Sequence, residues 1–373
     1  MDAHFTILAL ETSCDETAAA VVRGGRTIIS NVVASQIDEH RRYGGIVPEV
    51  ASRQHILALD AVVREALQPL PGGWNDIHAV AATYGPGLAG ALMTGLNAAK
   101  AIAWIRNLPF VGVNHIEAHI YANWLLAGEQ SGEPQFPLIA LVVSGGHTLL
   151  ALLEDHGCYR MLGQTRDDAA GEAFDKVARL MGLGFPGGPA IQQAAADAPG
   201  GVTLPRAWLR DSYDFSFSGL KTAVLHQIRE HEAREASLQV GAAKGATGRR
   251  GSAPKSGGAP PVSQAGGPPR LSPAFVARLA RAFQESVVDV LVTKTVEAAR
   301  AYGATEILLA GGVAANVRLR EELQRRAPVG VRVPPVALCT DNAAMIGAAA
   351  FYRFDVGRQD GWDLDVNPGL RLG

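Results

Sequence analysis

Leu141-Val142-Val143-Ser144-Gly145-Gly146-His147 and Ile307-Leu308-Leu309-Ala310-Gly311-Gly312-Val313 both run from an apolar segment into a pair of glycines. Each apolar segment is short and uninterrupted, which is typical of a strand buried on both faces of a sheet. Paired glycines after a strand let backbone N–H groups face an oxyanion without a Cβ in the way. One such pair usually makes only a tight turn, but two of them favour nucleotide binding. Their similarity also suggests two related lobes.

Short apolar segments bounded by turn residues predict five strands, at 6–10, 79–83 and 110–113, and at 138–143 and 306–310, which lead into the two glycine pairs. Helical patterns fall between them, including a long one that begins at Ser272-Pro273 and stops near Gly303. Serine before a proline at the first helical position is a common start of a helix. The alternation of strands and helices predicts an α/β protein with mixed or parallel sheets.

The composition indicates a folded protein with no general affinity for polyanions. With 373 residues, 47% of them hydrophobic, the chain is long enough for two packed lobes. Its 34 Lys and Arg residues nearly balance 36 Asp and Glu residues, so a nucleic acid would have to be held by local patches such as Arg41, Arg42 and Arg53. The apolar segment 88–105 is interrupted by Asn97 and Lys100, which argues against a membrane span.

The cysteines and the N-terminal sequence indicate where the protein is located, and the composition of one segment indicates whether that segment is folded. The three cysteines lack metal-type spacing, and the N-terminus lacks a basic region before its first apolar segment. We therefore predict a cytoplasmic protein without a signal peptide. In segment 239–269, 22 of 31 residues are Gly, Ala, Pro or Ser, and none is aromatic. Such a composition predicts a disordered insertion within the second lobe.

The histidine pair in Val113-Asn114-His115-Ile116-Glu117-Ala118-His119 predicts a metal site. Residues four apart on a helix share one face, so both imidazoles can bind the same cation. Asp341, between a strand-like segment and the terminal apolar helix, is the candidate oxygen ligand, although it could instead cap that helix. Histidines at this spacing are more often core or surface residues, but His115 stands at a strand-to-helix junction. The donor set suits Zn(II) or Fe(II) without separating them.

Acidic residues mark a second candidate region. Glu11-Thr12-Ser13-Cys14-Asp15-Glu16-Thr17 turns an apolar strand abruptly acidic, and residues 17–22 predict a returning strand. The carboxyl end of a strand is where α/β proteins place substrate contacts, although a solvated hairpin turn is equally consistent with the pattern. Asp175 lies in the last turns of a predicted helix, where the dipole disfavours a carboxylate, so it is a candidate ligand residue.

The motifs together resemble the tRNA adenosine threonylcarbamoyltransferase family, in particular its bacterial branch. The resemblance covers nearly the whole chain except 239–269. It rests on ordered motifs at 10–17, 44–49, 114–119, 143–148, 167–176, 186–189, 215–222, 311–316 and 339–342.

The resemblance implies an actin-like, sugar-kinase-like fold with a nucleotide cleft between two lobes, formed by 1–113 with 340–373 and by 114–339. It implies transfer of a threonylcarbamoyl group from threonylcarbamoyl-AMP to the exocyclic amine of adenosine 37 in tRNAs that read ANN codons, with release of AMP. It also implies two partners, a smaller actin-like paralogous subunit and a P-loop ATPase. In this chain the implied metal ligands are His115, His119 and Asp341, and the implied adenylate-binding residues are Val142, Val143, Ser144, Gly145, Gly146, Asp175, Gly188 and Asn316.

Several points stay open on the sequence. The reaction needs a base for the amine proton, and His147, Asp15 and Glu16 are unranked candidates. An actin-like ATPase or sugar kinase would share the glycine turns but would not need the histidine pair. A metalloprotease is disfavoured because the position of Glu117 matches neither H-E-x-x-H nor H-x-x-E-H. A non-catalytic scaffold would be expected to lack the complete ligand set.

Overall fold

Two five-stranded sheets with the same connectivity form the framework of the chain in a computed structural model, which describes residues 2–125, 132–246 and 271–372. In the first sheet the order is β3-β2-β1-β4-β5, and in the second it is β10-β9-β6-β7-β8. In each sheet the first three strands along the chain, β1 to β3 or β6 to β8, form an antiparallel meander. The last two strands along the chain, β4 and β5 or β9 and β10, extend the sheet in parallel next to β1 or β6. The strands are β1 (Thr6–Glu11), β2 (Glu16–Arg23), β3 (Thr27–Ser35), β4 (Ala79–Gly85), β5 (Phe110–Asn114), β6 (Leu138–Val143), β7 (Thr148–Asp155), β8 (Cys158–Gln164), β9 (Glu306–Ala310) and β10 (Gly330–Arg332).

The five strands predicted from apolar segments are confirmed as β1, β4, β5, β6 and β9. Burial on both faces explains why they were recognisable. In β6, for example, Ile139 and Leu141 face one core, whereas Leu138 and Ala140 face another. A strand covered on both sides has no reason to alternate polar and apolar residues.

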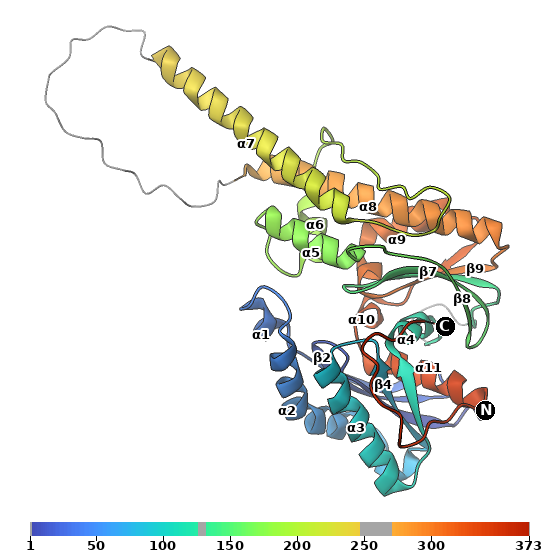
Figure 1. The fold of residues 1–373 in the computed structure, drawn as a ribbon. Helices are drawn as coiled ribbons and strands as arrows, with labels where there is room; N and C mark the ends of the chain where they lie inside the picture. The colour runs from blue at the N-terminus through green and yellow to red at the C-terminus, as the bar shows by residue number, and fades with distance from the viewer. Residues whose placement is uncertain (1, 126–131, 247–270, 373) are drawn as a thin grey trace, which may run out of the picture.

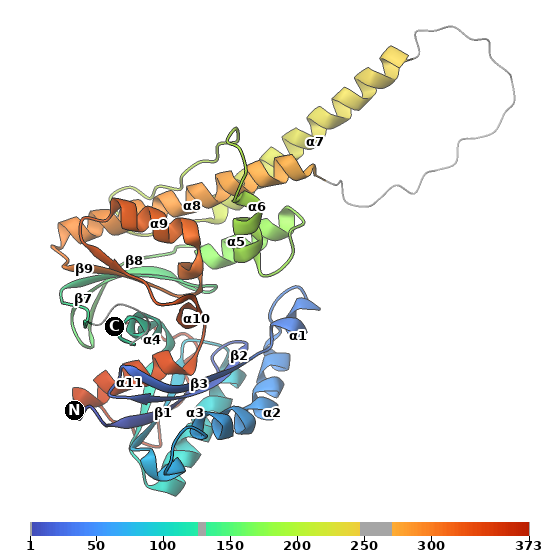
Figure 2. The same ribbon diagram turned by 180° about the vertical axis from the view of Figure 1, so that it is seen from behind.

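Helices cover both faces of each sheet. Helices α4 (His115–Tyr121) and α11 (Ala343–Asp355) lie between the two sheets and share a core with both (Figure 1). Helices α2 (Pro48–Leu67) and α3 (Ala89–Arg106) cover the outer face of the first sheet. The outer face of the second sheet is covered by α5 (Ala170–Leu180), α6 (Gly187–Ala195), α7 (Ser218–Ala246), α8 (Pro273–Ala301) and α9 (Val317–Arg326) (Figure 2). Shorter elements are α1 (Ile37–Arg41), α10 (Val336–Cys339), and the 3₁₀ turns η1 (Gly73–Asp76), η2 (Ala122–Trp124) and η3 (Gly312–Ala315).

The two glycine turns lie in the same lobe, which changes how their similarity is understood. They follow β6 and β9, which are parallel neighbours in the second sheet. Gly311 has φ +88°, and a Cβ there would lie 2.5 Å from the carbonyl oxygen of Val143. Only glycine fits so close to the neighbouring turn. The relation between the lobes therefore lies in the matching strand order of the two sheets, and the two glycine turns lie side by side within one lobe.

The predicted insertion differs from the structure at its beginning. Residues 239–246 continue helix α7, and residues 247–269 lie outside the described residues. Alanine adds to the biased composition of this segment together with glycine, proline and serine, but it has the highest helix propensity of all residues. Alanines at 242, 243 and 246 are consistent with the extended helix.

The lobe boundaries at 113/114 and 339/340 stay a prediction. No described helix is both long and apolar enough to cross a membrane.

Candidate functional site

Helix α4 places both histidines of the predicted metal site on one buried face. The chain passes directly from β5 into α4 through Asn114, whose side-chain oxygen accepts hydrogen bonds from the backbone N–H groups of Ile116 (2.8 Å) and Glu117 (3.3 Å). This cap satisfies N–H groups that the first turn would otherwise leave unpaired. The rings of His115 and His119 lie 4.6 Å apart, centroid to centroid. Their side chains are only 8% and 1% exposed.

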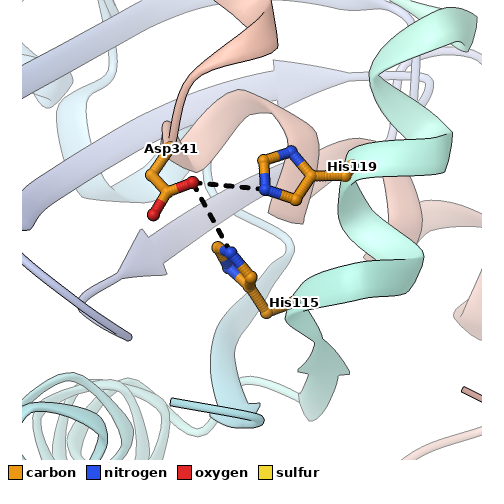
Figure 3. A group of neighbouring side chains, drawn as sticks. All are labelled: His115, His119 and Asp341. Atoms are coloured by element: carbon orange, nitrogen blue, oxygen red, sulfur yellow. Dashed lines mark ion pairs between the residues drawn. The ribbon is translucent and has the colours of Figure 1, made fainter. Parts of the chain in front are cut away.

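Asp341 meets the two histidines from the other side of the site (Figure 3). Its Oδ1 atom lies 3.5 Å from Nε2 of His115 and 3.2 Å from Nε2 of His119. The alternative role of Asp341 as a helix cap is wrong, because Asn342 caps α11 by accepting a hydrogen bond from the N–H of Met345. The structure therefore brings the three predicted ligands together, with one donor atom of each within 4.8 Å of the others.

The three side chains fit a divalent cation. Among the described residues, Nδ1 of His119 is buried without a hydrogen-bond partner, and its Nε2 atom has only the ion-pair contact with Asp341, although buried polar groups are normally satisfied. Burial by itself would lower the pKa of His115, but Asp341 and Glu11 raise it to about 9. Burial would raise the pKa of Asp341, but the histidines hold it well below its usual range. Two imidazoles and a carboxylate around one point suit Zn(II) or Fe(II).

His147 lies in the turn between β6 and β7, close to the histidine pair. Its backbone N–H donates to Oγ of Ser144 (3.1 Å), and its carbonyl accepts from the N–H of Ser144 (2.8 Å). Burial and the charges of His115 and His119 lower the pKa of His147 to about 4. An imidazole with this pKa is neutral near pH 7 and has a lone pair available for a proton.

Asp15 ends the turn between β1 and β2, and Glu16 is the first residue of β2. Oε1 of Glu16 accepts a hydrogen bond from Oγ of Ser35 (3.2 Å). Burial, together with the charges of Asp341 and Asp15, raises the pKa of Glu16 to about 9. Because Glu16 holds its proton in this arrangement, it resembles an acid more than a base at neutral pH.

The raised pKa of Glu16 gives a test in metal-free protein. Between pH 4.5, its ordinary pKa, and about 9, folded Glu16 keeps a proton that the unfolded chain has lost. The stability of the unmodified chain therefore falls over this interval relative to Glu16→Gln, which cannot ionise. In urea titrations with chelator, we expect the free energy of unfolding of the unmodified chain, relative to that of Glu16→Gln, to fall from pH 5 to pH 9. A constant difference would show that Glu16 titrates normally.

The predicted adenylate-binding residues take different positions. Val142 and Val143 are fully buried strand residues whose side chains face the two cores, so only their backbone atoms are available. Gly145 and Gly146 are exposed, with open space where a Cβ would lie. A Cβ on Gly171, in α5, would lie 2.5 Å from the carbonyl oxygen of Ser144, so this turn rests on the start of α5.

Three more predicted residues lie in α5, in α6 and at the start of α9. Oδ1 of Asp175 accepts a hydrogen bond from the N–H of Gly187 (2.7 Å), while Gly188 has open space in place of a Cβ. The side chain of Asn316 is already engaged, since its oxygen caps α9 at the N–H of Leu319 (3.0 Å) and its amide donates to Gln284 (2.9 Å). Binding of an adenylate by these residues stays a prediction.

Glu11 is a residue of the acidic motif at 11–17 for which the sequence alone indicated no role of its own. Glu11 is 0% exposed, and its Oε2 atom lies 2.9 Å from Nδ1 of His115. The only local signal was an acidic residue directly after the apolar run of β1.

The fold and the site together define a two-lobed α/β protein with a candidate metal centre between its sheets. Solved structures of HypF share this fold. The T. kodakarensis protein matches 94% of this chain at 13% identity with a TM-score of 0.58, and a full-length HypF in a phosphate- and nucleotide-bound form gives 14% identity over 94% of this chain and a TM-score of 0.56. The chain spans 48% and 46% of those proteins, about half their length. These likenesses confirm the actin-like, sugar-kinase-like fold and concern the fold alone.

A family model described as tRNA N6-adenosine threonylcarbamoyltransferase matches residues 27–348. A relative of that name from Thermomicrobium roseum is 53% identical over 98% of this chain and 96% of its own length. Another, from Dehalococcoides mccartyi, is 50% identical over 98% of this chain and 99% of its own length. The chain belongs to the tRNA N6-adenosine threonylcarbamoyltransferase family, as the resemblance of its motifs implied.

Proposed function

We propose that this chain transfers a threonylcarbamoyl group from threonylcarbamoyl-AMP to the exocyclic amine of adenosine 37 in tRNAs that read ANN codons. The observation that carries the proposal is family membership over nearly the whole chain. The convergence of His115, His119 and Asp341 supports it, because a kinase or ATPase of the same fold has no need of such a donor set.

The reaction exchanges one bond to the carbamoyl carbon for another. The amine nitrogen of the adenosine attacks that carbon, the bond from carbon to the phosphate oxygen breaks, and AMP leaves with the electron pair. The amine loses a proton to a base. An aromatic amine is a weak nucleophile, so the barrier falls mainly through polarisation of the carbonyl and stabilisation of the leaving phosphate.

Residues of this chain suit each of these tasks. A divalent ion held by His115, His119 and Asp341 would supply Lewis-acid polarisation of an oxygen on the donor. The N–H groups of Gly145 and Gly146 lie in an open turn suited to a phosphate. Neutral His147 favours the role of base, whereas Glu16 with its raised pKa is suited to giving up a proton.

The identity of the ion, Zn(II) or Fe(II), belongs to the proposal, as do the smaller actin-like subunit, the P-loop ATPase and the cytoplasmic location. The tRNA surface also belongs to it. Arg41, Arg42 and Arg53 each pair with an acidic residue one helical turn away, so they contribute little net charge. Partner subunits would then supply part of the basic surface.

Mass spectrometry of nucleosides tests substrate and reaction together. In cells depleted of this protein, tRNA is expected to lose threonylcarbamoyladenosine, while unrelated modified nucleosides stay at their normal level. Unchanged threonylcarbamoyladenosine would contradict the proposal. Mg²⁺-dependent ATP turnover by the isolated chain, unchanged in His115→Ala, would instead support the kinase or ATPase alternative.

A further inference from the structure

Glu11 is a fully buried carboxylate, and both of its oxygens have hydrogen-bond partners. It ends strand β1 and is 0% exposed. Its Oε1 atom accepts from the backbone N–H of Ser13 (2.5 Å), and its Oε2 atom accepts from Oγ1 of Thr83 (2.6 Å). The same Oε2 atom lies 2.9 Å from Nδ1 of His115. A buried charge without such partners would be strongly destabilising.

The contacts of Glu11 determine where His115 carries its proton. An ionised carboxylate only accepts hydrogen bonds, so the Nδ1 atom of His115 must be the donor at 2.9 Å. The hydroxyl oxygen of Ser13 lies 3.1 Å from the same nitrogen and can accept from it as well. In the neutral ring the lone pair is therefore on Nε2, the nitrogen that lies 3.5 Å from Asp341.

We propose that Glu11 is the positioning residue of the metal centre, which fixes the tautomer and orientation of His115 so that Nε2 faces the ion. Metal-ligating histidines commonly donate their other ring N–H to a carboxylate, which also makes them better ligands. Nδ1 of His119 has no hydrogen-bond partner among the described residues, so this support is specific to His115. The inference rests on the proposed metal centre and adds a residue outside its ligand set.

The Glu11→Gln variant separates positioning from simple core packing. Glutamine has the same shape, but its amide nitrogen can replace only one of the two oxygens. At the Oε1 position it would face the N–H donor of Ser13. At the Oε2 position it would donate to Nδ1 of His115 and move the ring proton to Nε2, where it blocks a metal bond. We expect Zn²⁺ affinity to fall about 10- to 100-fold.

The measurement is a titration of metal-free protein with Zn²⁺ against a chromophoric chelator. Thr83→Val is the matched control, since it removes a hydroxyl bonded to the same Glu11 oxygen but leaves the carboxylate and His115 in place. We expect its Zn²⁺ affinity to stay close to that of the unmodified chain. Equal affinity of Glu11→Gln and the unmodified chain, or an equal loss in both variants, would overturn the inference. Absence of Zn²⁺ binding by the unmodified chain would overturn the metal centre as well.

A second measurement holds even if Glu11→Gln does not fold. In the unmodified chain labelled with ¹⁵N-histidine and loaded with Zn²⁺, the NMR couplings of His115 should show a proton on Nδ1 and none on Nε2. A proton on Nε2 would overturn the inference. Because this readout does not involve transfer activity, it is independent of the proposed substrate.

Discussion

The Asp341→Ala variant is expected to form no threonylcarbamoyladenosine above the level of a reaction without enzyme. Asp341 is the only oxygen donor of the group, and its Oδ1 atom is the point on which both histidines converge. Loss of the ion removes several kcal/mol of stabilisation of the transition state, which corresponds to at least about 10³-fold in rate. The readout is nucleoside mass spectrometry in a reconstituted reaction, together with the bound metal content. His115→Ala is expected to lose activity in the same way.

The control for Asp341→Ala is Thr340→Ala, an exposed neighbour whose backbone carbonyl accepts a hydrogen bond from Asn342 and whose side chain makes none with the described residues. It should keep normal product yield and metal content. Urea unfolding of the metal-free proteins should show that Asp341→Ala is folded, since Asn342 rather than Asp341 caps α11. Normal product yield from a folded, metal-depleted Asp341→Ala protein would remove the ion from the mechanism.

Local sequence patterns predicted the elements of the fold but not their duplication. Strands such as β6 are recognisable because both faces meet hydrophobic cores, and α8 because its start at Ser272-Pro273 is a local signal. The relation between the lobes lies in the order of hydrogen-bonded strands, which no local pattern contains. The similarity of the two glycine turns suggested two related lobes, but it is not evidence for them, since the turns follow β6 and β9, which belong to one sheet.

The same division applies to the site. Spacing identified His115 and His119, and Asp341, more than two hundred residues away, was a candidate from its place before the terminal helix and was also implied by the motif resemblance. Glu11 was missed as a partner of His115 because 104 residues separate them, and they meet only through the order β1-β4-β5 in the first sheet. Val142 and Val143 matched the motif equally well, but their side chains are required by the cores.

The Arg353→Met variant is expected to lower the free energy of unfolding by about 3–5 kcal/mol, because it leaves a buried carboxylate without its counterion. Nε of Arg353 donates to Oε2 of Glu117 (2.9 Å), and their side chains are 14% and 2% exposed. Nη1 of Arg353 also donates to the carbonyl of Gly112 in β5 (2.7 Å). Urea unfolding of the metal-free proteins measures the loss.

A matched exposed pair separates burial from charge. Arg64 and Asp60 on α2 are 77% and 76% exposed, so Arg64→Met should cost no more than about 1 kcal/mol. If Arg353→Met costs equally little, the pair at Glu117 is screened by solvent and does not hold α4.

The double variant Glu117→Gln with Arg353→Met identifies the cause of the loss. Glutamine removes the buried charge and can still accept the hydrogen bond that the hydroxyl of Tyr159 donates to Glu117 (2.8 Å). The double variant should therefore be more stable than Arg353→Met alone, which is the signature of coupled residues. Because Glu117 lies on α4 between the two histidines, Arg353→Met should also weaken Zn²⁺ binding, and the double variant should restore part of it. Stability and metal affinity that recover together would show that the buried ion pair keeps α4 in the position at which both imidazoles reach Asp341.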